Sequence, residues 1–137
     1  MVCPKRSITW LVLLVSTGVC ADWVKVDSAA DTGANKFIDI KAIRQTGPMN
    51  TMRRVWELSN LAKRSLGQVL SIKSHVEYDC KDRRIRIIEV ASFSEHWAQG
   101  ERLPAAGSDA KSGDWSDISN GSLGESIFKR VCPSDDS

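Results

Sequence analysis

Two histidines and several carboxylates are the side chains in this sequence whose types could support acid–base catalysis. His75 lies in a segment that alternates between polar and apolar residues, and His96 lies in a later polar stretch. Neither histidine has a nucleophile and a carboxylate beside it in a recognisable motif, and the sequence contains no G-x-S-x-G, H-E-x-x-H or P-loop pattern. The sequence therefore predicts a protein that is not an enzyme, with no catalytic residue, metal site or cofactor.

The carboxylates near His75 have a simpler explanation as ion-pair partners. Glu77, Asp79 and Asp82 stand among five basic residues, Lys73, Lys81, Arg83, Arg84 and Arg86. Opposite charges on neighbouring strands pair across the face of a sheet. We therefore interpret these acids as cross-strand partners of the basic residues rather than as a general acid and a general base.

The basic residues are the candidates for recognition of an acidic partner. Arg83, Arg84 and Arg86 crowd one short stretch, and Lys63 and Arg64 lie in a predicted turn. Gathered on one sheet face, they would form a positive patch for a polyanion or an acidic protein surface. The alternative is a solvated sheet face on which acids and bases are interleaved.

Tryptophan provides one further candidate contact residue. Trp97 lies in a polar segment, and an exposed tryptophan in a loop can be a binding hot spot. Its alternative is packing back onto its own domain. Trp56 has the phase of a core residue, and Trp115 and Ile118 mark a short return of the chain to the core, so both tryptophans are interpreted as structural.

Length and charge exclude several other classes of protein. The chain has 137 residues, 42% of them hydrophobic, with 19 basic and 17 acidic side chains. This length and composition are typical of one globular domain. The near-balanced charge argues against a strongly basic nucleic-acid binder.

The first 21 residues are typical of a secretory signal peptide. Lys5 and Arg6 precede an apolar core, residues 8–15, which is too short to span a bilayer. Small residues follow, so we expect cleavage after Ala21, with a mature domain at 22–137. The alternative is lipid modification of Cys20, although the residues before it are not the usual ones. Cleavage removes two basic residues and leaves equal numbers of acids and bases.

Two cysteines remain after this cleavage, Cys80 and Cys132. In an exported chain a single remaining pair favours a disulfide. The alternatives are a metal site or a redox pair. Neither cysteine lies in a C-x-x-C motif, and no histidine stands beside either at ligand spacing.

Alternation of apolar and polar residues predicts an antiparallel sheet of about five or six strands. The best alternation is in residues 69–80, which return as residues 84–93 in one long hairpin. Ile88 and Val90 fall out of phase with the isoleucines before them, which predicts a bulge near Ile87 or burial on both faces. Further strands are predicted at residues 23–26, 37–43 and 51–59.

Two other segments complete the predicted architecture. In the second strand, Ile38, Ile40 and Ala42 share one face, which predicts that the strand is half-buried. Residues 94–113 are polar and rich in small residues, which predicts a long, mobile surface loop.

One helix is predicted, near the C-terminus. Ser122 can cap it and Glu125 completes the capping-box spacing. Leu123, Ile127, Phe128 and Val131 then share one apolar face. Cys132 ends the same side, so a bond to Cys80 would fasten the helix across the sheet. The fold class is therefore α+β, an antiparallel sheet with a disulfide-linked C-terminal helix packed on it.

Several short motifs resemble the surface-adhesin protein E-like domain family of Gram-negative bacteria. They are Glu-Tyr-Asp-Cys at residues 77–80 and Arg-Arg-Ile-Arg at residues 83–86, followed by Trp115-Ser116, Gly121-Ser122 and Val131-Cys132. Trp23, Val55-Trp56 and Gly100 fill the remaining places, so the resemblance covers nearly all of residues 22–132. Phe93 stands where the family has a tyrosine, and the lipid-anchor context around Cys20 is poor.

The resemblance implies a fold, a disulfide and a function. It implies an antiparallel sheet with a C-terminal helix, and a bond between Cys80 and Cys132. It also implies an outer-membrane adhesin that dimerises and binds host proteins such as laminin, vitronectin and plasminogen. We expect an exported protein-binding domain, with Arg83, Arg84 and Arg86 as principal contacts and Lys63, Arg64 and Trp97 behind them.

A second functional reading needs no host ligand. An edge strand offers main-chain groups to a partner, so the domain could be a periplasmic structural or assembly factor of the cell envelope. The two readings place the mature protein at the outer surface and in the periplasm, respectively. Both exclude nucleic acid as the partner.

Overall fold

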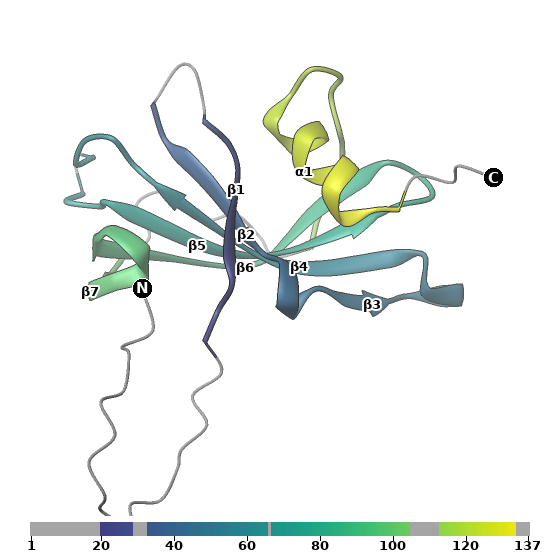
Figure 1. Ribbon diagram of the computed structural model, residues 1–137, viewed down its shortest axis with the longest axis horizontal. Coiled ribbons are helices and arrows are strands. Elements are labelled where there is room, and N and C mark those ends of the chain that lie inside the picture. The colour runs from purple at the N-terminus through teal and green to yellow at the C-terminus, as the bar shows by residue number, and fades with distance from the viewer. Residues whose placement is uncertain (1–19, 29–32, 66, 105–112, 134–137) are drawn as a thin grey trace, which may run out of the picture.

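An eight-stranded antiparallel sheet and one α-helix make up the part of the chain that the computed structural model describes, residues 20–28, 33–65, 67–104 and 113–133 (Figure 1). The sheet contains β1 (Trp23–Ser28), β2 (Asn35–Asp39), β3 (Arg44–Thr46), β4 (Met52–Asn60), β5 (Ser71–Asp79), β6 (Arg84–Glu95), β7 (Gln99–Leu103) and β8 (Ser116–Asp117). The main path is β1-β2-β4-β5-β6-β7, with β3 added to β4 and β8 added to β6. Three 3-10 turns, η1 (Ile40–Ala42), η2 (Pro48–Asn50) and η3 (His96–Ala98), and the helix α1 (Leu123–Val131) complete the fold.

The β5–β6 hairpin is a long antiparallel pair inside the sheet, flanked by β4 and β7, as the alternation predicts. Val76 pairs with Ile87, whereas the preceding His75 pairs with Glu89, so Ile88 is an extra residue in β6. An extra residue reverses the inside–outside alternation of the strand beyond it. The predicted bulge is therefore confirmed, and it explains why Val90 is out of phase with Ile87.

The two faces of the sheet have different environments. On the face that α1 covers, which we call the helix face, the core is formed by Ile38, Val55, Val76 and Tyr78 with Ile127, Phe128 and Val131 of the helix. The opposite face, which we call the outer face, carries His75 and Glu77 of β5. No α-helix packs on the outer face within the described residues (Figure 1).

The C-terminal helix forms and attaches as predicted. The Ser122 side chain accepts a hydrogen bond of 3.1 Å from the Glu125 backbone N–H, and the Glu125 carboxylate accepts one of 2.8 Å from Gly121. These bonds satisfy donors at the start of the helix, which no intrahelical acceptor reaches. A disulfide between Cys80 and Cys132 then fastens the end of the helix to the end of β5.

Three sequence expectations are wrong in detail. The second strand ends at Asp39 and turns into η1, so Ile40 is 45% exposed instead of buried. Trp56 points to the outer face, and its neighbour Val55 enters the core under α1. Part of the predicted loop at 94–113 is ordered structure, because η3 and β7 pack back onto β6.

The predicted signal segment lies outside the described residues except for its last two positions. In the described part of the chain no helix has the length and apolar character needed to cross a membrane.

Candidate functional site

A buried carboxylate organises the charges of the outer face. Glu77 is only 1% exposed, and its Oε2 atom accepts hydrogen bonds of 2.7 Å from Arg54 and 2.9 Å from Thr46. Its Oε1 atom accepts from the Arg86 guanidinium at 2.8 Å. Burial alone would raise the pKa of Glu77, but the hydrogen bonds from Arg54, Arg86 and Thr46 outweigh it and hold the pKa below its ordinary value.

The end of the β5–β6 hairpin contains a second buried acid. Asp79 accepts a hydrogen bond of 2.9 Å from Arg84 and further bonds from the backbone N–H groups of Lys81 and Asp82. Burial again works to raise the pKa of Asp79, and these bonds lower it overall. Arg83 pairs with Glu125 at 3.1 Å, which links the hairpin to α1.

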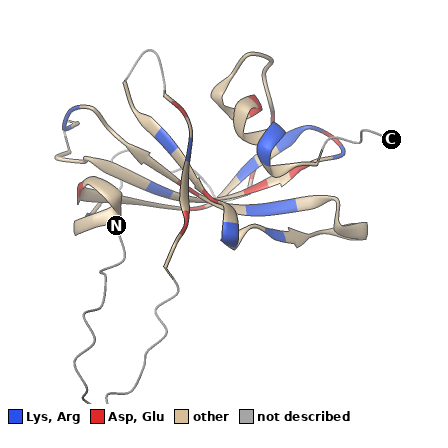
Figure 2. Cartoon of the chain, in the orientation of Figure 1, with Lys and Arg blue, Asp and Glu red and all other residues tan. Residues whose placement is uncertain are grey.

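The three candidate arginines are therefore brought together, but each has an acidic partner. Figure 2 shows basic and acidic segments interleaved along the central strands rather than separated into one positive field. The cross-strand pairs predicted from the sequence are present, with Arg86 on Glu77 and Arg84 on Asp79. The guanidinium groups still lie at the surface, because the side chains of Arg84 and Arg86 are 37% and 30% exposed.

Aromatic side chains stack on these cations. The Arg86 guanidinium lies 4.6 Å from the centre of the Trp115 ring, and that of Arg84 lies 5.3 Å from it. Both distances are within the range of a cation–π contact. Trp115 immediately precedes β8, which pairs with β6 opposite Arg84, so the short strand places the ring.

A second stack crosses β4 and β5 beside this cluster. The Trp56 ring and the His75 imidazole are parallel within 9°, with their centres 4.3 Å apart, and the Lys73 ammonium lies 4.4 Å from the Trp56 ring. Burial lowers the pKa of His75, and the nearby Arg54 lowers it further. The lowered pKa favours the neutral form of His75. The residues stacked with it, Trp56 and Lys73, supply no hydroxyl or thiol nucleophile.

The other three candidate residues lie at the opposite end of the sheet. Trp97 packs on Phe37 with ring centres 4.7 Å apart, its backbone N–H donates to Asn60, and it remains 37% exposed. Arg64 donates to the Ser94 carbonyl, which ties the β4–β5 connection to β6. Lys63 is exposed on the same connection.

The six candidate residues thus form two groups and not one patch. Strand β5 runs from the group containing Trp97 to the group containing Arg84, over nine residues. At about 3.3 Å per residue the two groups are separated by roughly 25–30 Å. A partner that contacts both must extend along the outer face.

Four tryptophans share this face. Trp23 lies opposite Asp39 and Trp56 lies opposite His75 in the strand register, while Trp97 and Trp115 reach the same side from η3 and the segment before β8. The sequence signal for this pattern was the parity of each tryptophan along its strand. It was misread at Trp56, because Trp56 shares the parity of Met52 and Leu58, whereas the side of β4 that α1 covers carries Val55 together with the charged Glu57.

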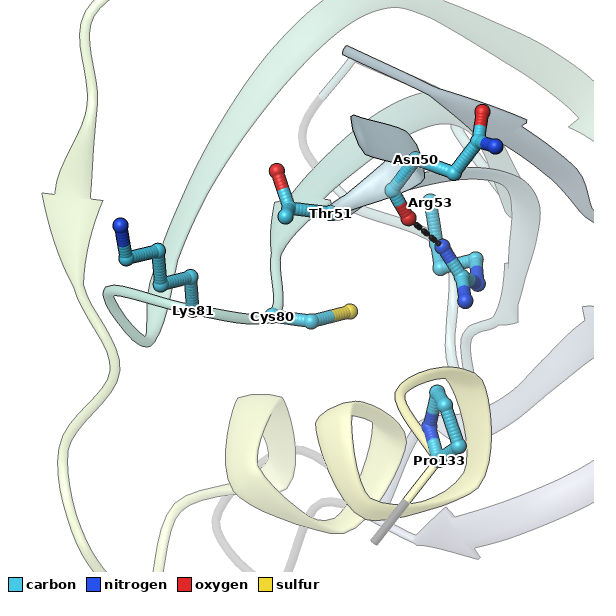
Figure 3. Close-up of a pocket in the computed structure, with 6 residues that line it drawn as sticks. All are labelled: Asn50, Thr51, Arg53, Cys80, Lys81 and Pro133. Atoms are coloured by element: carbon cyan, nitrogen blue, oxygen red, sulfur yellow. Dashed lines mark hydrogen bonds between the residues drawn. The ribbon is translucent and has the colours of Figure 1, made fainter. Parts of the chain in front are cut away.

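A small basic pocket lies beside the disulfide. It is lined by Asn50, Thr51, Arg53, Cys80, Lys81 and Pro133, with a volume of about 280 Å³ (Figure 3). Arg53 donates to the Asn50 carbonyl across this pocket. Its two cations, Arg53 and Lys81, have no acidic partner among the described residues, so the pocket would favour an anionic group.

The helix face holds a polar cluster that sequence reasoning missed. Glu57 is 4% exposed and pairs with Lys36 at 2.8 Å, and it also accepts a hydrogen bond from the Tyr78 hydroxyl. Burial and the Glu57 charge raise the pKa of Tyr78, which keeps the phenol protonated. The alternation of β4 predicts that Glu57 lies on a polar face. It gives no sign that Lys36 of β2 reaches Glu57 and pairs with it.

Metal binding has no geometric support in the described ranges. No group of three or more His, Cys, Asp or Glu side chains that could hold a metal ion is found there.

Comparison with known proteins agrees with this architecture. The family model described as surface-adhesin protein E matches residues 23–133. A structure of Haemophilus influenzae protein E is similar with a TM-score of 0.62 at 15% identity, covering 88% of this chain and 90% of that one. Protein E from non-typeable Haemophilus influenzae gives a TM-score of 0.59 at 14% identity, with 89% and 82% covered. No curated protein matches the sequence significantly.

Proposed function

Because the chain belongs to the surface-adhesin protein E family, we propose that it is an exported, non-enzymatic domain that binds another protein through the outer face of its sheet. The proposal includes removal of residues 1–21 and a location at the cell surface of a Gram-negative bacterium. Host matrix or plasma proteins such as laminin, vitronectin and plasminogen are the proposed partners.

The observation that carries this proposal is the composition of the outer face. Tryptophan and arginine are the residues most enriched in protein-binding hot spots. Here Trp115 is stacked on Arg84 and Arg86 at one end, and Trp97 is held on Phe37 at the other. Side chains fixed in this way lose little conformational freedom on binding, which favours affinity.

The ion pairs of the outer face determine how much charge contributes to binding a partner protein. Since Glu77 and Asp79 neutralise the candidate arginines, long-range attraction to an acidic partner is weak. The arginines would contribute through their remaining donors and their flat faces on contact. We therefore expect only a modest loss of affinity as salt is raised, in contrast to a polyanion-binding patch.

A surface plasmon resonance experiment tests the proposal. Laminin, vitronectin and plasminogen are immobilised in turn, and the mature domain is compared with Trp115→Ala and Trp97→Ala. Met49→Ala is the matched control, because Met49 is a large side chain of η2 that is 87% exposed and belongs to neither group. We expect at least one tryptophan variant to lose about tenfold or more in affinity and the control to lose nothing.

Two outcomes contradict the proposal. One is the absence of binding to all three proteins at low salt. The other is unchanged binding by both tryptophan variants when their circular dichroism spectra match that of the parent domain.

A second candidate function rests on the sheet edges. Strands β1 and β7 end the main path of the sheet, and each has one side unpaired by another described strand. Edge strands can add a strand from a partner or from a second copy of the chain. This supports a periplasmic assembly role or a homodimer, which cross-linking in cells and analytical ultracentrifugation would detect. A strictly monomeric protein with no envelope partner excludes both.

A further inference from the structure

A groove of about 240 Å³ lies between the N-terminal half of α1 and the helix face of the sheet. Its walls are mostly aliphatic, formed by Val76, Ile85, Ile87, Leu123 and Ile127. Ile87 is 39% exposed, so the groove opens to solvent beside an apolar side chain. A cavity of about 150 Å³ can hold benzene, so this groove has room for roughly ten non-hydrogen atoms.

The base of the groove contains an unused hydrogen-bond donor. Ser74 lines the groove and is 9% exposed, yet its hydroxyl makes no hydrogen bond to any described residue. Arg84 Nε is the one fully buried side-chain donor without a partner among the described residues, so the Ser74 oxygen is open to the groove and not sealed in the core. A ligand atom in the groove would supply the missing partner.

A second donor reaches the same place. The Lys36 ammonium has three N–H groups, of which one is directed to Glu57 at 2.8 Å and one to Ser59 at 3.1 Å. Lys36 and Glu57 both line the groove, and Glu57 lies directly opposite Ser74 in the strand register. The groove therefore offers two donors near one another at its polar end.

The charge of this end selects the type of ligand head group. Lys36 already pairs with Glu57, whose other oxygen accepts from the Tyr78 hydroxyl, so the cluster is neutral as a whole. A carboxylate ligand would add a second negative charge beside Glu57 in a poorly solvated place. A neutral carbonyl accepts both donors without that repulsion.

We propose that this groove binds a small neutral amphiphile, an acyl chain that ends in an amide or ester carbonyl. The chain lies between Ile87 and the α1 residues Leu123 and Ile127. The carbonyl oxygen accepts hydrogen bonds from Ser74 and from the third N–H of Lys36. This site is separate from the outer face, so it does not depend on the proposed adhesin function.

An NMR titration of the disulfide-bonded mature domain tests the site. Octanamide is the probe because it has the estimated size and a neutral carbonyl. Octanoate has the same chain with a charged head, and it serves as the comparison. We expect octanamide to shift the amide signals of Ser74, Ile87 and Leu123, and octanoate to bind at least tenfold more weakly.

Position 124 supplies a blocking variant with a matched control. Gly124 lines the groove within α1, and a Cβ atom there meets only ordinary contacts, at 3.5 Å from Ser122 and 3.9 Å from Ile118. Gly124→Leu should fill the groove and abolish octanamide binding, whereas Gly124→Ala should leave it unchanged. Both residues favour the helix more than glycine does, and a circular dichroism spectrum that matches the parent domain will show that loss of binding is not loss of fold.

The head-group contact has its own test. Ser74→Ala removes the unpaired hydroxyl and should weaken octanamide binding about fivefold, as expected for loss of one neutral hydrogen bond. The proposal is overturned if Gly124→Leu still binds octanamide, if the shifted signals lie away from the groove, or if no saturable binding occurs. Equal binding of octanoate and octanamide overturns the neutral-head assignment.

Discussion

At the scale of single residues, three buried carboxylates of this domain are paired with basic side chains. Glu77 and Asp79 are almost fully buried on the outer face, and Glu57 is buried on the helix face. Each has at least one basic partner within 3 Å. Burying a carboxylate without such partners would cost several kcal/mol, so the arginines and the lysine are required for these positions to be charged.

Glu77→Gln is expected to destabilise the domain by roughly 1–3 kcal/mol. The amide cannot accept the same set of charge-assisted bonds, and Arg54 and Arg86 lose their common partner. The estimate is below that for a fully buried pair because both arginines are partly exposed to water. Urea unfolding followed by tryptophan fluorescence measures the change.

Asp82→Asn is the matched control for that substitution. Asp82 also pairs with an arginine, Arg84, but its side chain is 56% exposed. Exposed pairs contribute about 0–1 kcal/mol, so its unfolding free energy should barely change. Equal effects of the two substitutions would show that burial does not determine how much the Glu77 ion pairs contribute to the free energy of unfolding.

At the scale of elements, the hairpin and the helix were predictable because their signals are local. The alternation in β5 and the capping residues Ser122 and Glu125 act within a few residues of sequence. The second strand was overextended because Ile40 continues the alternation after the chain has already turned into η1. Strand β7 was missed because its residues are polar and its pairing with β6 is its main stabilising contact.

The candidate site was less predictable than the fold. The arginines of the hairpin were correctly placed near one another, since they lie within one strand and its turn. Their distance from Trp97 was not visible, because it depends on how many residues of β5 separate the two ends. The Lys36–Glu57 pair joins β2 to β4, and pairing of distant strands leaves no signature in either strand alone.

Replacement of both Cys80 and Cys132 by alanine should lower the free energy of unfolding by about 4 kcal/mol. The bond closes a loop with a sequence separation of 52, and its loss frees the unfolded chain from that constraint. Reduction of the parent domain with dithiothreitol should give the same shift in urea midpoint. Dithiothreitol should have no effect on the double variant, and a shift there would point to a different cause.

At the scale of the whole molecule, the lowered pKa values of Glu77, Asp79 and His75 all make the domain less stable as the pH falls. The pKa of Glu77 and of Asp79 is lower in the folded domain than in the unfolded chain, so each stabilises the fold above its ordinary pKa. That contribution is lost as the pH falls through the folded pKa. The pKa of His75 is also lowered, so protonation on acidification favours the unfolded chain.

Stability should therefore fall in two stages on acidification. The first stage begins as the pH falls below 6.5, the ordinary pKa of histidine, and the second as it falls below 4.5, that of glutamate. Urea unfolding at a series of pH values measures both. His75→Gln should remove the first stage and keep the second, whereas a domain that becomes more stable between pH 7 and 5 would contradict the assignment.

The additional residue in β6 gives the hairpin one position that its ladder does not need. Removing Ile88 would leave Val76 paired with Ile87 and His75 paired with Glu89 as consecutive pairs, so both halves of the strand would keep their present faces. Val76 has no such spare neighbour, because every residue of β5 from Ser71 to Asp79 has a partner in β6. A single-codon deletion of Ile88 should thus be far less damaging than a single-codon deletion of Val76, which would turn half of β5 over.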